Sequence, residues 1–86
     1  MRNLKKILFC GDQIAEHVSP LGDFEAVIEF EGKFYFASGV KDFGINRGDC
    51  FLIHEITAND AVRWANKTFA DTYAAELTAE IEEKAR

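Results

Sequence analysis

The apolar residues in the last third of the chain recur with the spacing of one helix face. At about 100° per residue, one stripe contains Ala58, Val62, Ala65, Phe69, Tyr73 and Leu77, with Ile81 drifting towards its edge. Thr57 precedes Asp60 by three residues, the spacing of a capping box. No Gly or Pro follows Gly48. The pattern predicts one helix over about residues 58–85. At about 1.5 Å per residue that helix would be roughly 40 Å long, so its last two turns are expected to project.

Residues 24–38 show the period-two alternation of a β-hairpin, which reverses near Glu31 and Gly32. A two-residue loop made of Glu31 and Gly32 would set Ile28 against Tyr35. A three-residue loop is the alternative, and it would place the glycine in the left-handed position of a bulged turn. We favour the three-residue loop.

This longer loop has consequences for neighbouring side chains. It pairs Glu29 with Lys33 and turns Phe34 to the face of Ile28. It also puts Phe30 into the turn. There the ring either folds back over the sheet or stays exposed as a contact residue.

The other elements are shorter. Leu4–Cys10 is apolar on both faces and predicts a central strand. Residues 13–18 fit either a single helical turn or a returning strand, and Cys50–Ile56 predicts the last strand. Residues 40–49 predict a glycine-containing loop, in which Phe43 either covers the sheet edge or is an exposed anchor.

These elements predict one α+β domain over residues 1–86, a mostly antiparallel sheet of three to five strands packed on one long C-terminal helix. Hydrophobic residues make up 48% and charged residues 29% of the chain, as in ordinary globular proteins. The net charge of −5 disfavours direct nucleic-acid binding, which requires a basic patch.

The N-terminal apolar run is too short for a signal peptide, and no segment approaches a membrane span, so we expect a cytoplasmic protein that does not bind membranes. Cys10 and Cys50 are expected to be reduced, buried thiols.

Catalytic and metal chemistry find little support in the sequence. Cys50 and His54 would share a strand face, but they would stand about 13 Å apart, too far for one zinc ion. Cys10 or Cys50 with His17 carries no supporting motif for a nucleophilic pair. We therefore expect no cofactor, no metal site and no enzymatic activity.

Two surface features remain as candidate partner-binding sites. Trp64 lies about 200° round the helix from Val62, away from the core stripe. It is either covered by other residues or exposed as an interface anchor.

Acidic residues crowd the helix C-terminus, where the macrodipole disfavours them. They include Glu76, Glu82 and Glu83, and the outward side of the predicted hairpin adds Glu25, Glu29 and Glu31. They form either a solvated surface or a contact for a basic partner.

In its small size, its acidity, its lack of a catalytic constellation and its few strands followed by an acidic helix, the chain resembles small phage-encoded inhibitors of host defence, anti-CRISPR proteins among them. The resemblance implies binding to a nuclease or CRISPR complex in the host cytoplasm, with carboxylates taking the place of phosphates. The first hypothesis is therefore a non-enzymatic, protein-binding inhibitor that blocks a basic surface. The alternative is an assembly module that homodimerises through its long helix.

Overall fold

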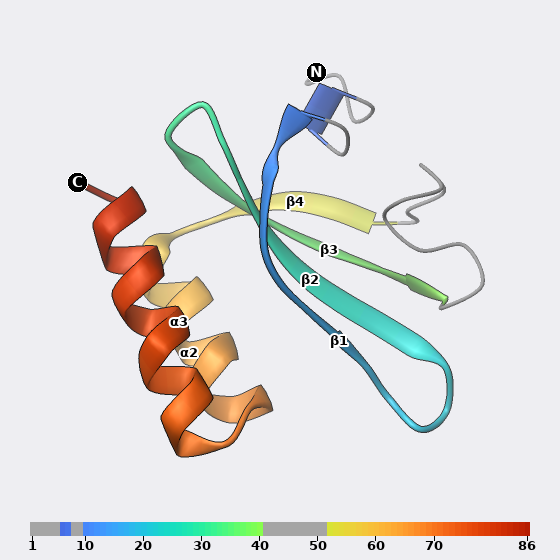
Figure 1. Cartoon of the computed structure of the whole chain (residues 1–86). Helices are drawn as coiled ribbons and strands as arrows, with labels where there is room; N and C mark the ends of the chain where they lie inside the picture. The colour runs from blue at the N-terminus through green and yellow to red at the C-terminus, as the bar shows by residue number, and fades with distance from the viewer. Residues whose placement is uncertain (1–5, 8–9, 41–51) are drawn as a thin grey trace.

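The computed structural model describes residues 6–7, 10–40 and 52–86. At its centre is a four-stranded antiparallel sheet in which each strand pairs with its neighbour in the sequence (Figure 1). The strands are β1 (Asp12–Val18), β2 (Asp23–Phe30), β3 (Lys33–Val40) and β4 (Leu52–Ile56). The predicted α+β class and antiparallel sheet are confirmed. Residues 13–18, left open by the sequence, belong to a strand.

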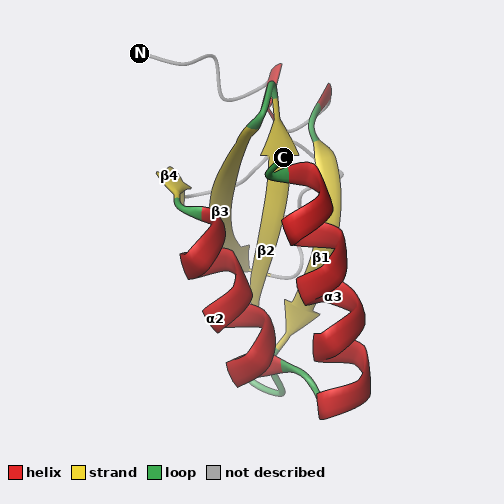
Figure 2. Cartoon of the chain, turned by 90° about the vertical axis from the view of Figure 1, so that its left-hand side faces the viewer, coloured by secondary structure: helices red, strands yellow, loops and turns green. Residues whose placement is uncertain are grey.

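Two helices follow the sheet where the sequence predicted one. They are α2 (Ala58–Thr68) and α3 (Asp71–Lys84), which lie side by side over one face of the sheet (Figure 2). Between them the chain is extended at Phe69 (φ −116°, ψ 161°) and at Ala70 (φ −63°, ψ 152°). The prediction of one continuous helix over 58–85 is therefore wrong.

The chain reverses direction between α2 and α3, and packing explains why. The reversal lets an apolar stripe of each helix face the same sheet. Ala61 and Ala65 of α2 are buried there, as are Leu77 and Ile81 of α3. A straight helix of roughly 40 Å would exceed the longest dimension of the molecule, which is 31 Å. No glycine or proline marks the reversal, so the sequence pattern gave no sign of it.

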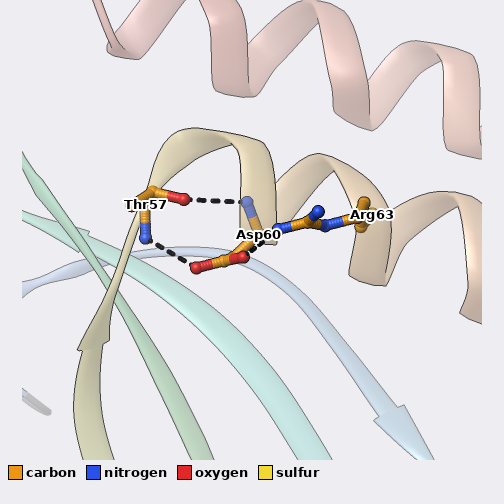
Figure 3. Close-up of polar contacts among 3 residues, drawn as sticks. All are labelled: Thr57, Asp60 and Arg63. Atoms are coloured by element: carbon orange, nitrogen blue, oxygen red, sulfur yellow. Dashed lines mark hydrogen bonds and ion pairs between the residues drawn. The ribbon is translucent and has the colours of Figure 1, made fainter.

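The start of α2 is the predicted capping box (Figure 3). The Thr57 hydroxyl accepts a hydrogen bond from the Asp60 backbone N–H at 3.1 Å, and the Asp60 carboxylate accepts one from the Thr57 backbone N–H at 3.3 Å. Arg63 donates to the same carboxylate. This contact with Arg63, followed by the hydrogen bonds with Thr57, holds the pKa of Asp60 below its ordinary value.

The turn between β2 and β3 contains two residues, so the favoured three-residue loop is wrong. Phe30 pairs with Lys33, and Ile28 pairs with Tyr35. Glu31 (φ 52°) and Gly32 (φ 81°) both have positive φ, as a type I′ turn requires. Such a turn matches the right-handed twist of the strands, and this preference prevails over the strain at Glu31.

This register decides which residues face the helices. Successive β2 residues alternate between two cores. Val27 lies on the helix side with Phe34, whereas Phe24 and Ile28 lie on the opposite face. Phe34 was expected on the face of Ile28, and the one-residue difference in the loop reverses that assignment. A β-bulge in β1 brings both Ile14 and Ala15 into the helix-side core.

The opposite face of the sheet is covered in part by the N-terminal residues. Lys6, Ile7 and Cys10 are helical, so the predicted strand over Leu4–Cys10 is wrong for the residues described. Ile7 is 1% exposed and packs in the core of that face. A Cβ at Gly11 would lie 2.4 Å from Ile28 Cγ2 and 2.4 Å from the Ile7 carbonyl oxygen, so only glycine fits where the helical residues meet β1.

Some predictions fall outside the described residues, namely those for Phe43, for Cys50 and for the loop over 41–49. Cys10 is exposed, and it forms no disulfide with the described part of the chain. The expectation that it is buried is therefore wrong. Within the described ranges, no helix has both the length and the apolar character that crossing a membrane requires.

Candidate acidic and aromatic surfaces

The acidic residues that the sequence singled out on the last helix lie on the outer face of α3. Glu76, Glu82 and Glu83 are exposed. None of the three forms an ion pair with a residue in the described ranges. The opposite side of α3 buries Leu77 and Ile81 in the helix-side core. The helix therefore holds these three carboxylates, called here the α3 acidic face, on the side away from the core.

The end of α3 is docked on the sheet and does not project, contrary to the prediction. Ile81 is fully buried, and the Lys84 ammonium donates a hydrogen bond to the Asp12 carboxylate on β1. This hydrogen bond, with the nearby charges of Asp12, Glu80 and Glu29, raises the pKa of Lys84 above its ordinary value. The reversal between the helices returns α3 along β1, which places its last turn beside Asp12. Lys84 therefore pairs with Asp12 of the sheet and not with the α3 acidic face.

The predicted hairpin residues have three different environments. Glu31 is exposed in the turn and faces Lys6 at 3.9 Å, an exposed pair of small energetic value. Phe30 ends β2, packs partly against the core opposite the helices, and has the Lys6 ammonium 5.9 Å from its ring centroid. The prediction that Phe30 lies in the turn is therefore wrong, because Phe30 belongs to a strand. Glu29 is half-buried, and its carboxylate accepts the Gly32 N–H at 2.8 Å, which stabilises the turn. Glu31 is the most accessible of the three.

Trp64 lies between α2 and the sheet, so the expectation that it points away from the core is corrected. Its indole Nε1–H donates to Glu25 Oε1 at 3.3 Å. Its ring centroid is 5.2 Å from that of Phe69 and 6.5 Å from that of Phe36, and both ring pairs are close to perpendicular. Trp64 is half-buried. The two-residue turn puts Phe36 on the same sheet face as Glu25, and α2 packs on this face.

A set of partly exposed rings extends from Trp64, called here the aromatic cluster. Its members are His17, Phe36, Trp64, Phe69 and Tyr73. Phe69 is central, with the ring of Tyr73 at 4.9 Å and 84° and the ring of His17 at 5.9 Å and 82°. His54 extends the cluster through Phe36 at 5.6 Å. The cluster joins β1 and β3 to the segment where α2 ends and α3 begins.

Sequence reasoning assigned two members of this region to the wrong environment. Tyr73 was expected in the core stripe but is 44% exposed, because the break at Ala70 restarts the helical phase. Glu25 was expected on the outward side of the hairpin, yet it pairs with His17 and shares the helix-side face with Val27. The alternation of Glu25, Val27 and Glu29 contained this information.

The described ranges contain two histidines and one cysteine, which the sequence offered as candidates for metal or nucleophilic chemistry. In the described ranges there is no group of three or more His, Cys, Asp or Glu residues that could hold a metal ion. His17 contacts the ring of Phe69, whereas His54 contacts that of Phe36. The contact between Trp64 and Glu25 brings together an aromatic ring and a carboxylate, two groups suited to binding cations.

Comparisons with known proteins supply no family for the chain. No protein-family model matches it, and neither the curated proteins nor the solved structures contain a match.

Proposed function

We propose that the protein is a non-enzymatic inhibitor that binds the basic surface of a partner protein through the α3 acidic face. One observation carries the proposal. Glu76, Glu82 and Glu83 are exposed together on one helix, and none is neutralised by a cation in the described ranges. Lys84, the described cation nearest to them in the helix, is bonded to Asp12.

The way α3 is held supports this role. Leu77 and Ile81 are buried, and the Lys84 contact fixes the last turn on β1. The carboxylates therefore stand on a rigid scaffold, and a partner does not have to pay the entropy of ordering the helix. Glu76 and Glu83 are two helical turns apart, about 10 Å along the axis. Fixed charges of one sign accelerate association with an oppositely charged surface.

Glu31 supplies a second acidic contact in this proposal. The turn between β2 and β3 and the C-terminal end of α3 lie at the same end of the molecule (Figures 1 and 2). Glu31 is exposed in that turn, and its pairing with Lys6 is weak because both side chains are largely solvated. A basic surface that covers the end of α3 would therefore also meet Glu31.

The partner class follows from the chemistry of the surface. A protein that binds nucleic acid presents Lys and Arg in the arrangement that phosphates require. Exposed carboxylates on a rigid helix compete for the same cations. Our proposal therefore includes the class that the chain resembles in size and acidity, phage inhibitors of anti-CRISPR type. The partner would then be a nuclease or a CRISPR complex whose nucleic-acid-binding surface is blocked.

The homodimer alternative has less support. It relied on a projecting helix and on an outward Trp64, whereas Ile81 is buried and Trp64 bonds to Glu25. Size-exclusion chromatography with light scattering distinguishes the two hypotheses, because the inhibitor proposal is compatible with a monomer and the assembly module is not.

The proposal is tested by affinity capture with a matched control. The immobilised chain is exposed to host lysate, and retained proteins are identified by mass spectrometry. Replacement of Glu76, Glu82 and Glu83 by Gln should release the retained protein, and so should added double-stranded DNA. A control with three neutralised carboxylates elsewhere (Glu16→Gln, Asp23→Asn, Glu55→Gln) should retain it. Equal retention by both triple variants would contradict the proposed contact surface.

A further inference from the structure

The aromatic cluster contacts the carboxylate of Glu25 through Trp64. Glu25 is half-buried on the helix-side face of β2, and one of its oxygens accepts the indole N–H of Trp64. In the described part of the chain, no lysine or arginine pairs with it. An ionised carboxylate that is partly removed from water is stabilised by a cation or by further hydrogen bonds. The site can therefore accept a positive charge from outside.

Trp64, which donates to Glu25, belongs to a set of rings that favours the same kind of ligand. Trp64 and Phe69 are inclined at 86°, and Phe69 and Tyr73 are inclined at 84°. Aromatic faces carry negative partial charge and attract cations within about 6 Å of the ring centroid, and Trp attracts them most strongly. Tyr73 is 44% exposed. Across the sheet, Glu25 pairs with Ser38 and Ser38 pairs with Leu52, which is 50% exposed. Solvent therefore reaches the outer edges of this region.

We propose that Glu25 and the aromatic cluster bind an arginine side chain of the partner protein. This inference rests on the proposed function, because it assumes a basic partner, and it assigns that partner a second contact apart from the α3 acidic face. Arginine fits better than lysine for two reasons. Its planar guanidinium stacks on aromatic rings, and it offers several N–H donors to the Glu25 oxygens while Trp64 keeps its own bond.

Trp64 is the only tryptophan in the chain, so its fluorescence reports directly on this site. The full chain is titrated with acetylated, amidated hexaarginine at about 150 mM salt, where exposed charges are screened beyond about 8 Å. We expect a saturable change in Trp64 emission, with hexalysine binding at least about threefold more weakly. The titration is repeated in the triple variant Glu76→Gln, Glu82→Gln and Glu83→Gln, which removes peptide binding at α3.

Glu25→Gln is the decisive variant. Glutamine keeps an oxygen that can accept the indole N–H, but it lacks the charge, so the dissociation constant for hexaarginine should rise about tenfold or more. Glu16→Gln is the matched control, because Glu16 is an exposed carboxylate on the opposite face of β1 and pairs with Ala26. It should change the constant less than about twofold. Tyr73→Ala removes an exposed ring with little risk to folding and should also weaken binding.

Three results would overturn the assignment. They are the absence of a saturable emission change, equal dissociation constants for hexaarginine in Glu25→Gln and Glu16→Gln, and equal binding of the two peptides.

A failure of this assignment can be distinguished from a failure of the proposed function. In the lysate capture, loss of the partner on Glu25→Gln but not on neutralisation of the α3 acidic face would refute the α3 contact and support the Glu25 site. The reverse pattern would refute the Glu25 site alone.

Discussion

The indole Nε1 of Trp64 donates a hydrogen bond to Oε1 of Glu25 at 3.3 Å and joins α2 to β2 across 39 residues of sequence. Because the acceptor is charged and the pair is partly buried, we expect a measurable coupling between the two side chains. In a double-mutant cycle with Trp64→Phe and Glu25→Ala, urea denaturation should give an interaction energy of about 0.5 to 1.5 kcal/mol. Additive effects would show that the hydrogen bond contributes nothing to stability.

The break between the helices makes a prediction about proline. Ala70 has φ −63°, which proline adopts without strain, and the preceding Phe69 is extended, as a residue before proline prefers. Ala70→Pro should therefore leave the free energy of unfolding unchanged or raise it by up to about 1 kcal/mol. In a continuous helix the same substitution would cost about 3 kcal/mol or more. Thermal unfolding followed by circular dichroism separates these outcomes, with Ala75→Pro inside α3 as the destabilised control.

Ile81 is expected to be a core position at which truncation has a large effect. Its side chain is fully buried, and Ile81→Ala should lower the free energy of unfolding by about 2 to 5 kcal/mol. Phe69, which the sequence placed at the centre of the core stripe, is half-buried at the end of α2. Phe69→Ala should cost less than Ile81→Ala. Urea denaturation of both variants checks the order, and a larger loss for Phe69→Ala would contradict the packing described above.

The capping box at Asp60 should make stability fall in acid. The pKa of Asp60 is lowered in the folded state, first by Arg63 and then by Thr57. Its contribution is therefore present above the ordinary pKa of 3.8 and is lost as the pH falls through the folded value. Asp60→Asn should be less stable than the wild type at pH 6, and the difference should shrink below about pH 4. Arg63→Gln should weaken the same pH dependence, and a difference that stays constant with pH would exclude Asp60 as its source.

Much of the architecture follows from local signals in the sequence. The hairpin, the last strand and the capped start of α2 each depend on residues within a few positions of one another, such as Thr57 with Asp60. The helical reversal was not predictable in this way. Phe69 and Ala70 have no residue type that forces an extended backbone, and the break is selected by the packing of two apolar stripes on one sheet.

In the candidate sites, too, some features follow from local sequence signals and others depend on long-range packing. The exposure of Glu82 could be predicted, because its position is opposite the predicted stripe. Glu76 and Glu83 fall on that stripe in a continuous helix, and they are exposed because the break at Ala70 restarts the helical phase. The environment of Trp64 depended on the register of β2 against β3, which a single residue in the turn decides. Once Glu31 and Gly32 form a two-residue turn, Phe36 shares the sheet face of Glu25 and Val27, and the packing of α2 on that face forms the aromatic cluster.

The proposed function is tested most directly by the rate at which the captured partner associates with the immobilised chain. Neutralising Glu76, Glu82 and Glu83 should leave Tm nearly unchanged or slightly raised, because it relieves like charges near the helix C-terminus. The association rate should fall, and for the wild type it should also fall as salt rises from about 50 to about 500 mM. If the triple variant associates at the wild-type rate and salt leaves that rate unaltered, the α3 acidic face is a solvated surface and the inhibitor proposal is contradicted.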